Sequence, residues 1–176
     1  MTGTLGTVDR GSRFDDFYVF ERPKLVAALT FVTGDVDVAA DAVDEACARA
    51  VERLGRGHEI DELGAWIRVV AMNFARGRFR RRANDRKARA RLSTQAGAQE
   101  SEPAIDTPAV LDVRAALAKL PMRQREVCVL FYFLDCSVGE IAEQLHTSAG
   151  NVKASLHRAR VALAELLGED ELEATP

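Results

Sequence analysis

Residues 137–167 read SVGEIAEQLHTSAGNVKASLHRARVALAELL. Apolar side chains recur at intervals of three and four on both sides of His146-Thr147-Ser148, which predicts two amphipathic helices joined by a short turn. Ala142 is small where the two helices would cross, and Val152 is placed to pack the second helix back onto the first. The stretch therefore predicts a helix-turn-helix, with a plain helical hairpin as the alternative.

The turn of this unit departs from the commonest choice of residue. His146 occupies a position where glycine is frequent, because the backbone there tends toward positive φ. Histidine is among the non-glycine residues enriched at positive φ, so the turn is feasible with some backbone strain. The sequence therefore still predicts a helix-turn-helix, with the backbone of His146 in the left-handed region.

A helix-turn-helix presents the first residues of its second helix to the major groove of DNA. Ser148 suits the N-cap position, which leaves backbone N–H groups free to meet phosphate. Among the predicted exposed residues, the cations are expected at phosphates, and Asn151 and Ser155 near base edges. The complete predicted set is Ser148, Asn151, Lys153, Ser155, His157, Arg158 and Arg160.

A second feature is a dense block of positive charge. Residues 76–91 contain eight arginines and Lys87 against a single acid, Asp85, although the formal net charge of the chain is −3. Such local density is an electrostatic footprint for a polyanion. A solvated basic helix end is the alternative interpretation.

Composition divides the chain into two units. Residues 93–108, STQAGAQESEPAIDTP, lack periodicity and have the composition of a flexible linker. They separate residues 10–92 from residues 109–168, and an acidic tail follows at 169–176. Both units show helical periodicity, so the expected fold class is all-α, with two small helical domains joined by a flexible linker.

Three helices are expected in the first unit. The first begins near Phe14 and is kinked or restarted at Pro23. The second is capped by Asp37, and its apolar stripe runs to Leu54. The third runs from about residue 61 to about 92 and turns steadily more basic. Its predicted inner face is Leu63, Trp66, Ile67, Val70 and Phe74, with Met72 on the other side.

Several classes of protein are disfavoured. No apolar run approaches the ~20 residues of a membrane span, and the first residues lack the pattern of a secretory signal, so a cytoplasmic location is expected. Phosphate-loop, zinc-protease, nucleophile-elbow and dinucleotide motifs are absent, which argues against an enzyme. Cysteine and histidine spacing predicts neither a metal nor a cofactor, and Cys136 is expected to be more exposed than Cys47 and Cys128.

Three segments together resemble a bacterial RNA polymerase sigma factor of the extracytoplasmic-function (ECF) group, which keeps the second and fourth sigma regions. Residues 25–54, LVAALTFVTGDVDVAADAVDEACARAVERL, resemble the region that docks on core polymerase. Residues 65–82, AWIRVVAMNFARGRFRRR, resemble the region that melts and reads the downstream promoter element. Residues 117–166 resemble region four, most specifically in LP..QREV, EIAEQL and NVKASLHRAR.

The resemblance implies a transcription initiation factor that binds core RNA polymerase and directs it to promoter DNA. It implies that Asp41, Asp44 and Glu45 dock on polymerase. It also implies that the third helix and its preceding loop capture the melted strand, through Asn73, Arg76, Arg80 and Arg81. Trp66 matches the family tryptophan, although its periodicity favours core packing. An anti-sigma protein is an implied further partner. The alternative function is a helix-turn-helix regulator that binds DNA without docking on polymerase.

Overall fold

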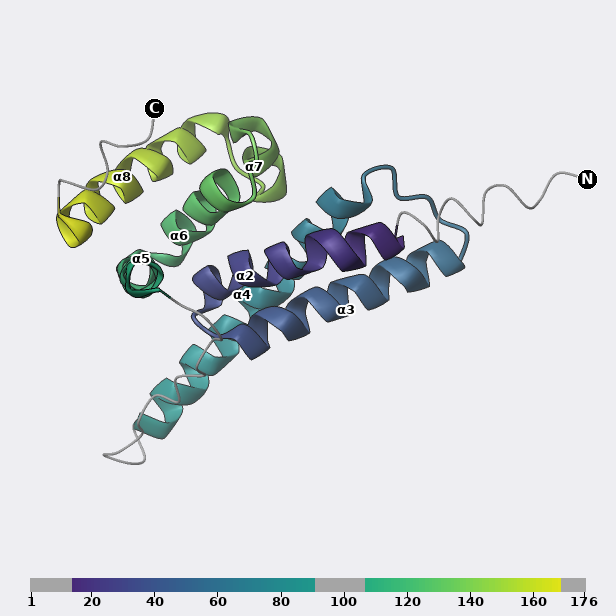
Figure 1. Ribbon diagram of the computed structural model, residues 1–176, viewed down its shortest axis with the longest axis horizontal. Coiled ribbons are helices and arrows are strands. Elements are labelled where there is room, and N and C mark those ends of the chain that lie inside the picture. Colours follow the sequence, from purple (N-terminus) through teal and green to yellow (C-terminus); the bar gives the residue numbers. More distant parts are fainter. Residues whose placement is uncertain (1–13, 91–106, 169–176) are drawn as a thin grey trace, which may run out of the picture. The chain divides into compact units, whose positions relative to one another are not determined.

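The computed structural model describes residues 14–90 and 107–168, with side chains for all of these except 82–90. Most of the expected linker, the acidic tail, residues 10–13 and the end of the basic block lie outside the described residues. Within the described part every regular element is a helix, which confirms the predicted all-α class (Figure 1).

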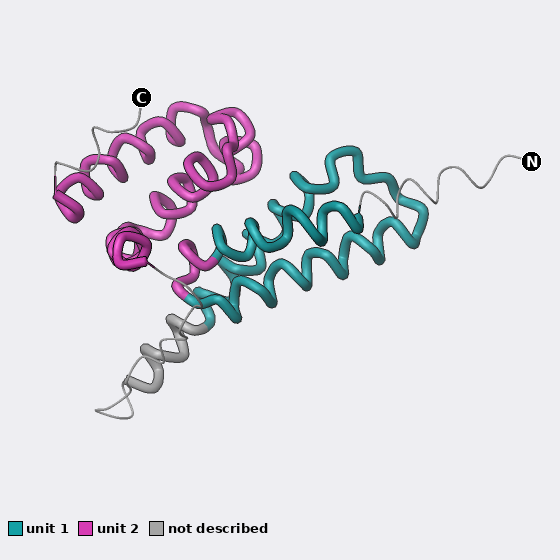
Figure 2. The backbone as a smooth tube through the Cα atoms, in the orientation of Figure 1, with its two compact units in different colours: residues 1–29, 35–100 teal, residues 30–34, 101–176 magenta. Residues whose placement is uncertain are grey.

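The chain divides into two compact units. Unit 1 comprises residues 1–29 and 35–100, and unit 2 comprises residues 30–34 and 101–176 (Figure 2). The division lies near the one expected from composition, except that residues 30–34 group with unit 2.

Unit 1 is built from η1 (Phe17–Glu21), α2 (Arg22–Thr33) except its last four residues, α3 (Val36–Gly55) and α4 (Leu63–Ala90). The element η1 is a π-helical turn that leads directly into α2, where a kink or restart near Pro23 was expected. Gly34 adopts φ 73° between α2 and α3, a conformation that glycine reaches without strain. Asp35, rather than the predicted Asp37, caps α3, because its Oδ1 accepts a hydrogen bond from the Val38 N–H at 3.0 Å.

Helices α3 and α4 pack against each other through small side chains. On α4, Ile67 and Met72 are buried together with alanines, whereas Trp66, Val70 and Phe74 are only half-buried. The predicted inner face is thus confirmed for Leu63 and Ile67 and only in part for the other three, and the outer position predicted for Met72 was wrong. The fully buried alanines are Ala39, Ala42, Ala46 and Ala50 of α3 and Ala71 and Ala75 of α4.

Unit 2 contains α5 (Pro108–Lys119), α6 (Met122–Cys128), η2 (Val129–Phe133), α7 (Val138–Gln144) and α8 (Ala149–Leu167). A capping box starts α7, in which the Ser137 hydroxyl accepts from the Glu140 N–H and the Glu140 carboxylate accepts from the Ser137 N–H. Ser148 caps α8 as predicted, and its Oγ accepts from the Asn151 N–H at 3.2 Å.

The helix-turn-helix formed by α7 and α8 is packed as its periodicity predicted. Ile141 and Val152 are fully buried, and Ala142 is 8% exposed at the crossing. His146 adopts φ 49°, which confirms the left-handed turn. Arg123 of α6 holds this turn from behind, because its Nη2 donates to the Leu145 carbonyl at 2.9 Å. Leu166, predicted on the inner stripe, is 38% exposed and lies outside it.

A buried arginine holds the end of α5. Arg125 is 6% exposed, and its Nη2 donates to the carbonyls of Ala118 at 2.5 Å and Leu120 at 3.2 Å. These carbonyls have no partner within the helix because they end it. Burial lowers the pKa of Arg125, and the charge of the adjoining Glu126, itself 2% exposed, acts in the opposite direction. The QREV part of the sequence motif is therefore a structural network.

The cysteines are all buried, which corrects the expectation for Cys136. Cys136 is 4% exposed and its Sγ donates to the Leu134 carbonyl at 3.5 Å. Burial raises the pKa of Cys128 to about 11, and burial together with the Asp44 carboxylate raises the pKa of Cys47 to about 11. Both thiols are therefore protonated at neutral pH and unreactive as nucleophiles.

Candidate nucleic-acid and partner interfaces

The acidic face, defined as Asp41, Asp44 and Glu45, lies along α3, where Asp41 and Asp44 are exposed and Glu45 is partly exposed. Asp44 accepts two hydrogen bonds from Arg22 of α2, from Nε and Nη2, at 2.8 Å each. Asp41 accepts from Nη1 of Arg78 on α4 at 2.6 Å. The predicted docking carboxylates are thus exposed, but their charge is partly compensated by arginines of the two neighbouring helices.

Arg22 is fixed by more than the ion pair. Its guanidinium carbon lies 5.1 Å from the centroid of the Tyr18 ring, an arrangement that permits a cation–π interaction. Hydrogen bonding to Asp44 raises the pKa of Arg22. The side chains of Tyr18, Arg22 and Asp44 therefore form one connected group across α2 and α3.

Glu45 belongs to a second group, on the side of α3 that meets α4. Its Oε1 accepts from Arg49 Nε at 3.2 Å, one helical turn further on. The guanidinium carbon of Arg49 lies 4.4 Å from the centroid of the Phe74 ring. Arg49 is therefore held between a carboxylate and an aromatic face, and its position is defined by both.

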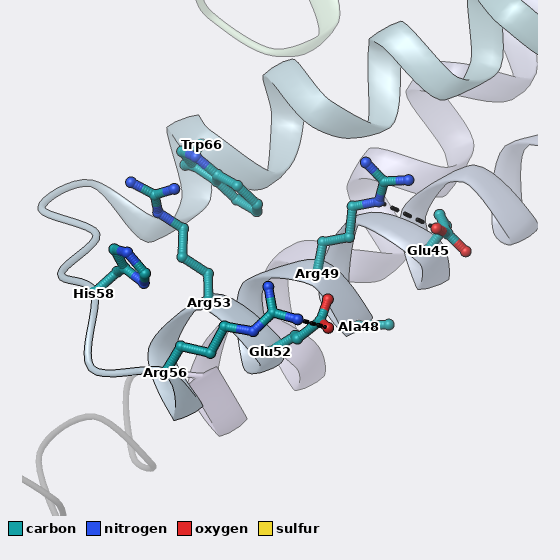
Figure 3. A pocket seen from close by; sticks show the side chains of 8 residues that line it. All are labelled: Glu45, Ala48, Arg49, Glu52, Arg53, Arg56, His58 and Trp66. Carbon is teal, nitrogen blue, oxygen red and sulfur yellow. Dashed lines mark hydrogen bonds and ion pairs between the residues drawn. The ribbon is translucent and has the colours of Figure 1, made fainter.

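Beside Arg49 the surface is hollowed between the second half of α3 and the beginning of α4. Arg53 extends from α3 toward Trp66 of α4, and His58 of the connecting loop lies on the same side (Figure 3). We call this the arginine hollow. Its lining residues are Glu45, Ala48, Arg49, Glu52, Arg53, Arg56, His58 and Trp66.

The charges of the arginine hollow do not cancel. Glu45 pairs with Arg49, and Glu52 pairs with Arg56 at 2.5 Å. Arg53 has no ion-pair partner among the residues that the structure describes, and it lies beside the indole of Trp66 (Figure 3). A cation next to a half-buried aromatic ring suits a phosphate with a stacked base. Sequence reasoning missed this site because Trp66 was assigned to the core.

The strand face, defined as Asn73, Arg76, Arg80 and Arg81, follows along α4. Asn73, Arg80 and Arg81 are exposed as predicted. Arg76 is half-buried, and its Nη1 donates to the Asn73 Oδ1 at 3.4 Å, so it orients the amide. All four lie on α4, more than one helical turn after Trp66 of the arginine hollow.

The N-cap and the first three turns of α8 carry most of the predicted DNA-contacting residues at exposed positions. Ser148, Asn151, Lys153, His157 and Arg158 are all exposed. The amide nitrogen of Asn151 donates to Thr147 Oγ1 at 3.2 Å, which fixes the orientation of the amide. Thr147 is therefore a positioning residue that sequence reasoning did not single out.

Two members of the predicted set differ from expectation. Ser155 is 7% exposed and therefore cannot reach a base edge from this conformation. Arg160 is exposed, but its Nε donates to the Tyr132 hydroxyl at 2.6 Å, which ties α8 to η2. Ala154, which the prediction omitted, is exposed three residues after Asn151 and could contact a thymine methyl group.

Two further findings limit the chemistry of the described residues. No cluster of three or more histidine, cysteine or acidic side chains among them is arranged to hold a metal ion. No helix in this part of the chain is both long and apolar enough to cross a membrane.

Comparison with known proteins gives consistent relationships over both units. The family model of Sigma-70, region 4, matches residues 111–163, which span most of α5 and the helix-turn-helix. The ECF RNA polymerase sigma factor EcfG of Rhodopseudomonas palustris (strain TIE-1) is 30% identical over 152 residues, which is 86% of this chain and 83% of that protein.

Two solved structures share the arrangement of helices. The sigma factor RpoE from Bartonella quintana, solved with the anti-sigma factor NepR, has a TM-score of 0.71 and 24% identity, covering 88% of this chain and 96% of its own. CnrH, solved with the cytosolic domain of CnrY, has a TM-score of 0.62 and 27% identity, covering 90% of this chain and 89% of its own.

Proposed function

Because the chain belongs to the extracytoplasmic-function sigma factors, we propose that its two units divide the work of promoter opening between the surfaces described above. The chain is a transcription initiation factor that binds core RNA polymerase and promoter DNA. The observation that carries this conclusion is the relationship to a sigma factor over 86% of the chain, which includes both units. This relationship does not favour the alternative function, a regulator that binds duplex DNA without docking on polymerase.

The acidic face of α3 is our proposed docking surface for core polymerase. Its carboxylates are exposed, and their charge would complement a basic surface and steer association. On docking, basic groups of polymerase would replace Arg22 and Arg78 as the ion-pair partners of Asp44 and Asp41. The free energy lost with the internal ion pairs is small, so these pairs oppose docking only weakly. Exposed pairs of this kind contribute about 0.2–1 kcal/mol each.

We propose that the arginine hollow and the strand face together hold the melted strand. The arginines of α4 supply a positive track for the phosphates, and Asn73 offers an amide to a base edge. Arg53 and Trp66 supply a cation and a stacking surface for one extruded base. Unit 2 would meanwhile hold the upstream element, with Lys153 and Arg158 at phosphates and Asn151 at a base edge.

Removing the aromatic face of Trp66 is expected to weaken strand capture. Loss of base stacking costs about 1–3 kcal/mol per base, so Trp66→Leu should raise the Kd of the holoenzyme for single-stranded promoter DNA roughly tenfold to a hundredfold. Trp66→Phe retains a ring and should recover most of the affinity. Fluorescence anisotropy of a labelled oligonucleotide measures both values.

Arg53→Gln provides an independent arm of the same test. Losing one phosphate contact on a single strand should reduce the slope of log K against log salt by about 0.7. If Trp66→Leu binds as tightly as Trp66→Phe, and the salt slope of Arg53→Gln is unchanged, the hollow does not hold the strand. Arg56→Gln, whose parent side chain is paired with Glu52, serves as the matched control.

An anti-sigma protein is our proposed third partner. The support is that a solved sigma factor of this fold is bound to the anti-sigma factor NepR, and a second is bound to the cytosolic domain of CnrY. We also propose a cytoplasmic site of action, where core polymerase works, and no catalytic activity of its own. Related proteins are initiation factors rather than enzymes.

A further inference from the structure

Gly77 lies in the interior of α4, where glycine destabilises a helix relative to alanine. Its φ is not in the left-handed region, which in the described part of the chain only Gly34, Gly57 and Gly168 reach among glycines. A Cβ built on Gly77 would have no heavy atom within 4 Å outside its chain neighbours and the nearby helix backbone. Neither backbone conformation nor packing within unit 1 therefore requires glycine at this position.

Gly64 of the same helix differs from Gly77 in that packing leaves little space for a Cβ. A Cβ at Gly64 would lie 2.8 Å from the Glu21 Oε2 and 3.7 Å from the Phe17 ring. Gly64 thus accommodates the packing of η1 against α4. Gly77 has no such neighbour, so its missing side chain leaves open space at the surface of α4.

The open space lies within the strand face. Gly77 follows Asn73 by four residues and precedes Arg80 and Arg81 by three and four. These spacings place the four residues on one side of α4. The flanking arginines are both engaged, Arg76 with Asn73 at 3.4 Å and Arg78 with Asp41 at 2.6 Å. Gly77 therefore forms a notch between an amide suited to a base edge and two exposed cations.

We propose that Gly77 is a positioning residue for strand capture, at which the sugar–phosphate backbone of single-stranded DNA lies directly against α4. Glycine allows this close approach because it has no Cβ. A side chain here would hold the strand away from the helix, and the hydrogen bond between Asn73 and a base edge weakens steeply with added distance. This inference rests on the proposed function of the strand face.

The test uses holoenzyme assembled from core polymerase and the full chain. The probe is the single-stranded oligonucleotide that the wild-type holoenzyme enriches from a randomised DNA pool. Gly77→Ala and Gly77→Leu should melt at the same or a higher temperature than wild type, because both residues favour helix. The Kd should nevertheless rise roughly tenfold for Gly77→Ala, which corresponds to about 1.4 kcal/mol, and further for Gly77→Leu.

Two controls separate the possible failures. Gly139→Ala in α7, where a Cβ would meet only Ser137 Oγ at 3.8 Å, should leave the Kd unchanged. The double variant Arg80→Ala/Arg81→Ala should weaken binding if the strand face is correctly placed. If that variant binds as wild type does, the proposed strand face is wrong, and this inference fails with it.

If the arginine variant loses affinity but Gly77→Ala does not, only the inference about Gly77 is overturned. A Gly77→Ala variant that loses melting temperature as well as affinity also overturns it, because the space would then not be open. A gain in stability combined with a loss of affinity is the result that the notch predicts.

Discussion

Replacing Arg125 with methionine is expected to destabilise unit 2 by about 3–5 kcal/mol, the usual cost of removing one partner from a buried charged network. The change leaves the carbonyls of Ala118 and Leu120 without their donor. It also removes the positive charge next to Glu126, which is 2% exposed and whose Oε2 lies 3.7 Å from the Nη1 of Arg123. That is a large part of the free energy of unfolding of a small domain, which is about 5–15 kcal/mol. Urea titration followed by circular dichroism measures the change.

Arg158→Met is the matched control for this prediction. It makes the same chemical change on the exposed side of α8, where substitutions usually alter stability by no more than about 0.5 kcal/mol. An Arg125→Met protein within that range of wild type would show that the buried network does not hold unit 2 together.

Neutralising the acidic face is expected to remove binding to core polymerase. The triple variant Asp41→Asn/Asp44→Asn/Glu45→Gln should raise the Kd for core polymerase roughly a hundredfold or more, or by about 2.7 kcal/mol, because close charge pairs across an interface are strongly coupled. Asparagine and glutamine are preferable to lysine, which would face Arg22 and Arg78 and so destabilise unit 1. Binding to immobilised core polymerase gives the measurement.

The control for this experiment carries an equal change of charge elsewhere. Asp112→Asn/Glu143→Gln/Glu165→Gln neutralises three exposed acids of unit 2 and should bind core polymerase as wild type does. Loss of binding by both triple variants would mean that net charge, rather than the acidic face, governs association. Undiminished binding by the first variant would place the docking surface elsewhere on the chain.

The helix-turn-helix was predictable because its periodicity, caps and turn all lie within one short stretch. Val152, Ala142 and the Ser148 cap each constrain the same local arrangement, and even the strained φ of His146 follows from its place in the turn. Several local signals agree here, and this agreement makes the structure of such a segment predictable from its sequence.

The inner face of α4 was not predictable from hydrophobicity alone. Ala71 and Ala75 are fully buried, whereas Trp66 and Phe74 are only half-buried, so small side chains rather than rings occupy the most buried positions. That outcome depends on which helix becomes the neighbour, and this information lies outside the segment. The same limitation concealed the arginine hollow, which needs residues from both helices.

The ion pairs of the acidic face were concealed for a related reason. Arg22 and Asp44 are 22 residues apart, and Arg78 and Asp41 are 37 residues apart. No helical spacing rule reaches across such distances. The sequence therefore identified exposed carboxylates correctly, but the arginines that compensate them became visible only in the folded unit.

Run-off transcription on promoter fragments, with core polymerase and the purified chain, tests the central claim most directly. We expect discrete transcripts only when both are present, and their loss when the acidic-face triple variant replaces the wild-type chain. Gel retardation of the same fragments by the chain alone provides the comparison. Fragments that the chain binds tightly, but from which transcription by core polymerase does not depend on it, would contradict the account and indicate a regulator of duplex DNA.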